Sequence, residues 1–177
     1  MLKITIVVGN PKPNSKTADI AKALVGKIFD TNSNPVRFID LATHADEIFK
    51  SQSQTMADLS AHVAASNFVL FACPTYKATY TGLLKGFLDR YPANGLKNVT
   101  ALAMMTGADF SHSLAPTVQL VPLLLELGAR VPMSGLYFNT GQMDQINDLI
   151  SARAEEAIDM FRSLAPVVGA IRTSSQK

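Results

Sequence analysis

Short, mostly apolar runs alternate with amphipathic stretches along most of this chain. The apolar runs cover Leu2 to Val8, Val36 to Leu41, Phe68 to Cys73 and Val99 to Met105, and a fifth falls within Ala129 to Phe138. Apolar runs of this length are typical of parallel strands that are covered on both faces. The pattern therefore predicts five buried, parallel strands.

The amphipathic stretches predict five helices. They cover Ser15 to Phe29, Met56 to Ser66, Thr81 to Tyr91, Leu114 to Leu127 and Ile146 to Leu164. In the fourth, Pro122 is interior and predicts a kink, because proline lacks the backbone N–H and its ring crowds the preceding turn. Residues 42–53 are polar and predict an irregular excursion at the surface.

Five strands that alternate with five helices predict one doubly wound α/β domain with a parallel sheet in the order 2-1-3-4-5. The predicted domain covers residues 1–171, and a polar tail follows at 172–177. In this strand order the first and third strands are neighbours, and the chain leaves them in opposite directions. A ligand crevice is therefore expected between the loops that follow these two strands.

The first of these loops, Gly9 to Thr17, joins a strand directly to a helix. A helix N-terminus presents unpaired N–H groups and favours an anion. Donors and positive charge are added by Ser15, Thr17, Lys12 and Lys16. The loop therefore predicts a phosphate site, with a capped helix that carries two solvated lysines as the plainer alternative.

Two common nucleotide-binding motifs do not fit this loop. A P-loop aligned on Lys16 and Thr17 has Asn10 and Ser15 where its two glycines belong. A dinucleotide fingerprint needs several glycines, whereas Gly9 is the only glycine in the loop. A pocket for a terminal phosphate monoester remains.

Two more polar loops follow the third and fourth strands. Pro74 to Gly82 carries two tyrosines, and either Tyr76 or Tyr80 could pack against a flat heterocycle. Thr106 to Ser113 contains Gly107, where the backbone could approach a ligand closely. Each loop alone is also explained as a strand-to-helix turn, but together the three loops fit FMN.

Composition narrows the function classes. A net charge of +2 does not by itself indicate a nucleic-acid or membrane-surface partner. The single cysteine, Cys73, excludes an internal disulfide and a multi-cysteine metal site, and its apolar surroundings predict a core residue. The N-terminus does not resemble a signal peptide, and no apolar span reaches 18 residues. The expected location is the cytoplasm.

The chain resembles the NADPH-dependent FMN reductase family, most closely the alkanesulfonate-type reductases of two-component monooxygenase systems. The resemblance covers roughly Ile4 to Gly135 and rests on three segments, Gly9 to Thr17, Pro74 to Asp89 and Thr106 to Ala115. These are similar to the family's Gly-Ser-Pro-Arg…Ser, Pro-x-Tyr-Lys-x…Gly-x-Leu-Lys…Leu-Asp and Thr-Gly-Gly…His-x-Leu segments. The chain departs from the family by Asn10 for serine, by Lys12 for arginine and by Ala108-Asp109 in place of the second glycine.

The resemblance implies a flavodoxin-like three-layer sandwich and hydride transfer from NAD(P)H to flavin, with no catalytic residue and no metal. It implies that FMN is contacted by Asn10, Lys12, Ser15, Lys16, Thr17, Pro74, Thr75, Tyr76, Lys77, Thr106, Gly107 and Ala108. It also implies a homodimer or tetramer and, for the alkanesulfonate type, a monooxygenase partner that takes the reduced FMN.

Two alternatives share the same fold. One is a reductase that retains its FMN and reduces a quinone, an azo dye or a metal ion. The other is a non-enzymatic, flavodoxin-like electron carrier. Flavodoxins are usually strongly acidic, whereas this chain has a net charge of +2, which counts against the carrier. The preference for NADH or NADPH is left open.

Overall fold

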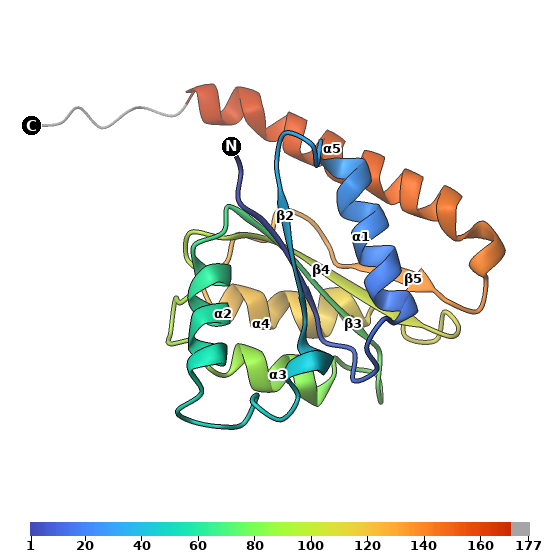
Figure 1. The fold of residues 1–177 in the computed structure, drawn as a ribbon. Coiled ribbons are helices and arrows are strands. Elements are labelled where there is room, and N and C mark those ends of the chain that lie inside the picture. The colour runs from blue at the N-terminus through green and yellow to red at the C-terminus, as the bar shows by residue number, and fades with distance from the viewer. Residues whose placement is uncertain (171–177) are drawn as a thin grey trace, which may run out of the picture.

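Five parallel strands form one sheet in the order β2-β1-β3-β4-β5 (Figure 1). The structure, a computed structural model, describes residues 1–170, so the predicted polar tail lies outside the described residues. The strands are β1 (Ile4–Val8), β2 (Val36–Asp40), β3 (Phe68–Pro74), β4 (Thr100–Gly107) and β5 (Leu136–Asn139). The predicted strand order is confirmed, and β5 forms only the last part of its predicted region.

Helices cover both faces of the sheet. The two on one face are α1 (Lys16–Ile28) and α5 (Ile146–Ala170), and the three on the other are α2 (Gln54–Ala64), α3 (Gly82–Leu88) and α4 (Val121–Glu126) (Figure 1). This arrangement is the predicted three-layer sandwich. Within the described residues, no helix combines the length and apolar character needed to cross a bilayer.

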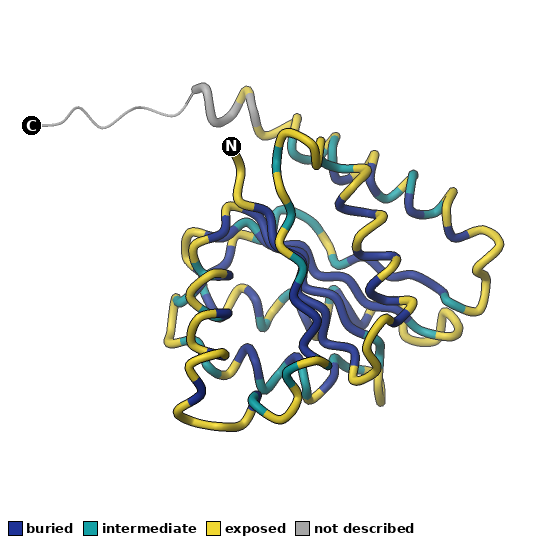
Figure 2. The backbone as a smooth tube through the Cα atoms, in the orientation of Figure 1, coloured by how far each residue is buried: buried dark blue, intermediate teal, exposed yellow. Residues whose placement is uncertain are grey.

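The central strands β1, β3 and β4 are buried except at the ends of β3 and β4, because the two helix layers enclose them (Figure 2). Val7 and Phe71 pair in register and face the core under α2, α3 and α4. Their neighbours Ile6 and Leu70 face the opposite core, under α1 and α5. Side chains alternate between the faces of a strand, so strands buried on both sides read as continuous apolar runs.

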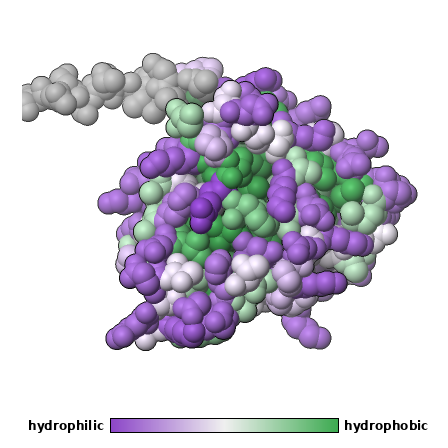
Figure 3. Space-filling model, viewed as in Figure 1, coloured by the Kyte–Doolittle hydropathy of each residue, from purple (hydrophilic) through white to green (hydrophobic). Residues whose placement is uncertain are grey.

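The edge strand β2 is covered less completely. Val36 and Phe38 are only half-buried, and the ammonium of Lys22 lies 4.0 Å from the centre of the Phe38 ring. Figure 3 shows the resulting hydrophobic surface over β2, between α1 and α2. The cation–π contact covers part of an edge strand that has no further strand beside it.

Pro122, where a kink is predicted, lies directly after a wider helical turn. A π-helical turn, η2 (Pro116–Leu120), runs directly into α4. In it the N–H of Val121 donates to the carbonyl of Pro116, five residues earlier. Pro122 has no N–H to donate and would crowd the carbonyl four residues before it in a regular helix. The wider turn accommodates the proline without breaking the helix.

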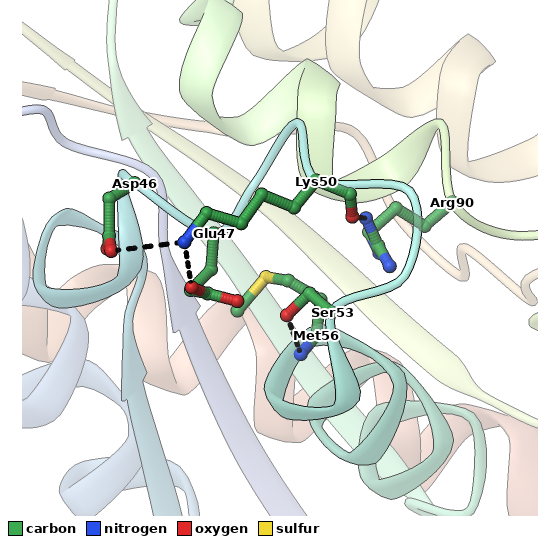
Figure 4. Close-up of polar contacts among 6 residues, drawn as sticks. All are labelled: Asp46, Glu47, Lys50, Ser53, Met56 and Arg90. Carbon is green, nitrogen blue, oxygen red and sulfur yellow. Dashed lines mark hydrogen bonds and ion pairs between the residues drawn. The ribbon is translucent and has the colours of Figure 1, made fainter.

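The predicted surface excursion is partly ordered by contacts with the end of α3. It begins with a 3-10 turn, η1 (Leu41–His44), and its Ile48 side chain is buried. Figure 4 shows Lys50 paired with Asp46 at 3.6 Å and with Glu47, while the guanidinium of Arg90 donates to the Lys50 carbonyl at 3.0 Å. The buried Ile48 side chain and the Arg90 guanidinium therefore attach the segment to the main domain. Its exposed ion pairs add little to the stability of the fold.

Candidate functional site

A cavity of about 480 Å³ lies at the carboxyl edge of the sheet, where the loops after β1, β3, β4 and β5 meet. It is lined by Asn10, Lys12, Asn14, Ser15, Lys16, Thr17, Pro74, Thr75, Tyr76, Thr106, Gly107, Ala108 and Thr140. Eleven of the twelve residues expected to contact FMN are among them, and Lys77 is the exception. The crevice expected beside the first and third strands is therefore present.

The first loop presents an anion-binding arrangement to this cavity. Ser15 is the N-cap of α1, and its hydroxyl oxygen accepts from the N–H of Ala18 at 3.3 Å. The first two amides of the helix, those of Lys16 and Thr17, have no intrahelical partner and remain available. The cavity is lined by Lys12 and Lys16 and by no acidic side chain. Charge and helix dipole therefore both favour a phosphate.

Local contacts hold the first loop in shape. The side-chain oxygen of Asn10 accepts from the N–H of Lys12 at 2.9 Å, which closes a tight turn. Asn14 adopts a left-handed conformation with φ of 51°, and its N–H donates to the carboxylate of Asp40 at 3.4 Å. Asparagine tolerates this conformation better than most residues. Asp40, which ends β2, therefore supports the loop from the neighbouring strand.

A buried chain of hydrogen bonds joins the first loop to the end of β4. The side-chain amide of Asn10 donates to the hydroxyl of Thr17 at 3.2 Å. That hydroxyl lies 2.8 Å from the hydroxyl of Thr106. Thr17 and Thr106 are each 2% exposed, so their hydroxyls bond mainly to one another rather than to solvent. Thr17 therefore helps to hold the first loop against the end of β4, a role that could not be predicted from its position in the sequence.

Gly9 brings the first loop against α3. A Cβ atom at this position would lie 2.5 Å from the Cβ of Leu84, closer than two such atoms can approach. The hydroxyl of Thr81 donates to the carbonyl of Gly9 at 2.5 Å and also caps α3, where it accepts from the N–H of Leu84 at 3.1 Å. The glycine is required here by the helix packed against it, and Thr81 joins the first two loops.

The second loop contains a two-residue hairpin. The N–H of Tyr76 donates to the carbonyl of Thr79 at 2.9 Å, and the two residues between them, Lys77 and Ala78, have φ of 52° and 64°. Positive φ at both positions is typical of a type I′ turn, which usually selects Asn-Gly. Lys77 is exposed at the tip of this hairpin and does not line the cavity.

Of the two candidate aromatic residues, only Tyr76 lines the cavity. Its side chain is 52% exposed, whereas Tyr80 packs against the core under α3. Beside Tyr76, the hydroxyl of Thr75 is buried and makes no well-formed hydrogen bond to a described residue, although the phenol of Tyr137 lies near it. A buried hydroxyl without a partner is costly, and a ligand in the cavity can supply the missing bond.

The third loop is supported from β5 and from the residue that follows it. The carbonyl of Gly107 accepts from the N–H and the hydroxyl of Thr140, at 2.7 and 3.1 Å. A Cβ atom on Gly107 would lie 1.9 Å from the hydroxyl oxygen of Tyr137. Glycine is therefore needed at this position because of Tyr137, and not only for close approach to a ligand. Thr140 was not predicted from the sequence, although residues that directly follow the fifth strand are expected at the same edge of the sheet as the other site loops.

Two residues with potential for direct chemistry lie outside this cavity. His112 is exposed and does not line it. Cys73 is fully buried in the core, and burial raises the pKa of its thiol to about 12. A thiol with this pKa stays protonated at neutral pH and is a poor nucleophile. Its burial agrees with the expected core role.

The residues present fit FMN on the geometry of the cavity. Its first loop offers helix amides and two lysines to a phosphate, and the buried Thr75 hydroxyl lacks a partner. The exposed ring of Tyr76 offers a surface to a flat heterocycle.

Comparison with known proteins shows which family this chain resembles. The sequence profile of the family described as NADPH-dependent FMN reductase matches residues 2–143. The NADH-dependent FMN reductase SfnF of Pseudomonas putida is 29% identical over 151 residues, which cover 82% of this chain and 81% of SfnF. An FMN reductase (NADPH) of Pseudomonas aeruginosa is 27% identical over 172 residues, which cover 90% of this chain and 92% of that protein.

A solved structure shows the same architecture. The apo form of an NADH:FMN oxidoreductase (EMOB) superposes with a TM-score of 0.78 at 28% identity, covering 92% of this chain and 89% of that one. The match to the family profile spans the first loop, the second loop, the third loop and Thr140. The chain belongs to the NADPH-dependent FMN reductase family.

Proposed function

We propose that this protein is an NAD(P)H-dependent FMN reductase that supplies reduced FMN to a monooxygenase. The observation that carries the proposal is a single cavity that combines a helix N-terminus, two lysines, an unpartnered buried hydroxyl and an exposed tyrosine ring. Family membership supports the cofactor, and the relative named SfnF supports reduction of FMN by a nicotinamide nucleotide.

The residues have separate roles in this proposal. Lys12, Lys16 and the Ser15 hydroxyl bind the phosphate, while the amides at the start of α1 complete the anion site. The Ser15 hydroxyl can do so while it caps the helix, because its oxygen accepts from Ala18 and its proton remains available. Tyr76 borders the flavin ring, and Thr75 donates to the cofactor. FMN, when bound, supplies the hydride-accepting centre, so no acid–base side chain is required.

We also propose a homodimer or tetramer that is located in the cytoplasm. Exposed apolar side chains lie along one side of η2 and α4, with Leu114, Val118 and Leu125 exposed by 70%, 55% and 52%. Phe110, in the third loop, is 57% exposed. Several exposed large apolar side chains in one region are compatible with an interface. Analytical ultracentrifugation of the purified protein tests the assembly, and a monomer at micromolar concentration would rule it out.

The central experiment is an FMN titration followed by NAD(P)H oxidation. We expect purified protein to be colourless, to bind added FMN and to reduce excess FMN with either nicotinamide nucleotide. Protein that purifies yellow and shows ping-pong kinetics with a quinone or azo dye would instead indicate a reductase that retains its cofactor. No FMN binding at 100 μM, about the upper part of the usual range for enzyme substrates, would reject the proposal.

A further inference from the structure

Two carbonyl groups of the third loop, those of Gly107 and Asp109, accept hydrogen bonds from β5 and the residue that follows it. The Gly107 carbonyl accepts two bonds from Thr140, and the Asp109 carbonyl accepts from the hydroxyl of Tyr137 at 2.6 Å. The Ala108 carbonyl packs against Gly141, where a Cβ atom would lie 2.3 Å from its oxygen. Hydrogen bonds therefore hold the peptide groups that carry the Gly107 and Asp109 carbonyls, and the peptide group between them packs against Gly141.

This arrangement determines where the amide groups of the loop point. In a trans peptide the N–H is directed opposite to the C=O of the same unit. The N–H groups of Ala108, Asp109 and Phe110 are consequently directed away from the residues that hold the carbonyls. None of the three donates a hydrogen bond to a described residue, and Ala108 lines the cavity. The loop thus offers unused donors to a ligand with an accepting edge.

Tyr137 is the side chain that most restricts this loop. Its hydroxyl donates to the Asp109 carbonyl and also fills the space where a side chain on residue 107 would lie. The residue is 8% exposed. Desolvation by burial raises the pKa of this phenol, the Asp109 carboxylate raises it further, and the nearby Thr75 hydroxyl lowers it in part. The hydroxyl therefore remains a donor throughout the neutral range.

We propose that Tyr137 is a positioning residue for flavin. Its hydroxyl holds the third loop so that the backbone amides of residues 108–110 meet the carbonyl-bearing edge of the flavin ring. Reduction places more negative charge on that edge, and fixed amide donors stabilise charge most strongly when they need not reorganise. Tyr137 thereby favours the reduced form of bound FMN over the oxidised form. This inference rests on the proposed FMN site.

The test compares Tyr137→Phe with Tyr91→Phe. The hydroxyl of Tyr91 also donates to a backbone carbonyl in a partly buried bond, that of Ser60 at 3.2 Å, but it lies under α2 and does not line the cavity. Both variants lose one partly buried phenol–carbonyl bond, so a purely structural role predicts the same small loss of stability in each. Only Tyr137→Phe should change flavin binding.

For Tyr137→Phe we expect the Kd of oxidised FMN to rise about fivefold and that of reduced FMN about fifteenfold. The threefold difference corresponds to a midpoint potential lower by about 15 mV for a two-electron couple. Tyr91→Phe should leave both constants unchanged. Equal flavin affinities and potentials in the two variants would overturn the proposal.

A readout on cofactor-free protein separates this inference from the proposed function. The Thr140 N–H donates to Gly107, so its hydrogen exchange reports whether the third loop is held. We expect that exchange to be about fivefold faster in Tyr137→Phe and unchanged in Tyr91→Phe. If wild-type protein binds no FMN, the proposed function fails. Unchanged Thr140 exchange in Tyr137→Phe shows separately that the tyrosine does not hold the loop.

Discussion

The two edges of the sheet each contain a cavity, but their chemistry differs. The carboxyl-edge cavity has threonines, two lysines and an unpartnered buried hydroxyl among its lining groups. The amino-edge cavity, about 370 Å³, is mainly apolar and includes Phe29, Phe68 and Phe161. The lining distinguishes the two edges: the carboxyl-edge cavity offers two lysines, a helix N-terminus and several hydroxyl groups to a ligand, whereas the amino-edge cavity is mainly apolar.

The same contrast appears in two buried threonines. At the carboxyl edge, Thr17 is bonded to Asn10 and Thr106, and all three line the cavity. Thr5, at the other end of the sheet, is bonded to Ser66 at 2.8 Å and to His62 at 3.2 Å. The second network is part of the scaffold and the first is part of the site. The following predictions separate scaffold effects from site effects.

The largest expected effect is a loss of stability from Phe68→Ala at the amino edge. The Phe68 ring lies 4.8 Å from Phe29 and 6.1 Å from Phe161, measured between ring centres, and the residue is 4% exposed. Truncation should lower the free energy of unfolding by about 3–5 kcal/mol. Urea unfolding measures this loss. FMN affinity of the folded variant should stay within about twofold of wild type. A larger change would show that the two edges of the sheet are energetically coupled.

Replacing the two buried threonines tests the contrast directly. Thr17→Val and Thr5→Val should each lower the free energy of unfolding by about 1–3 kcal/mol, because each leaves buried polar partners unsatisfied. FMN affinity should fall about fivefold in Thr17→Val alone, because Asn10 and Thr106 then lose their support. Isothermal titration with FMN at a temperature where both variants are folded provides the comparison. Equal FMN affinities in the two variants would contradict the assignment of Thr17 to the site and of Thr5 to the scaffold.

The phosphate site is tested by the double variant Ser15→Ala with Lys16→Ala. We expect FMN affinity to fall at least tenfold, about 1.4 kcal/mol, while the protein remains folded. The matched control is Ser53→Ala with Lys27→Ala, which removes the cap of α2 and a lysine in the last turn of α1, both away from the cavity. Fluorescence titration of FMN distinguishes the pairs. An unchanged Kd in the first pair would exclude the phosphate assignment.

The smallest expected effect comes from the hairpin tip. Changing Lys77 and Ala78 together to Asn and Gly should stabilise the protein by about 1 kcal/mol, because both positions have positive φ. Thermal unfolding measures the gain. FMN affinity should not change, because Lys77 does not line the cavity. A fall in affinity would show that Lys77 contacts the cofactor, as the family resemblance implies.

The strand order and the position of the crevice could be predicted because they follow from local patterns. Continuous apolar runs indicated buried parallel strands, and Ser15 and Thr81 were recognisable beside helix starts. The turn at Pro116–Leu120 could not be predicted, because proline alone does not determine whether a helix kinks or widens. The contact of Tyr137 with Gly107 could not be predicted, because it depends on strand register and side-chain direction, and neither can be determined from a single sequence.

The packing of Gly9 against α3 has a consequence for synthesis of the chain. The bond between the Thr81 hydroxyl and the Gly9 carbonyl joins positions 72 residues apart. A nascent chain that ends before α3 already contains the whole first loop but lacks the helix against which that loop is shaped. Thr106 and Thr140 emerge from the ribosome later still. Cofactor capture should therefore begin only after the fifth strand has joined the sheet, and FMN should not act as a template for the early steps of folding.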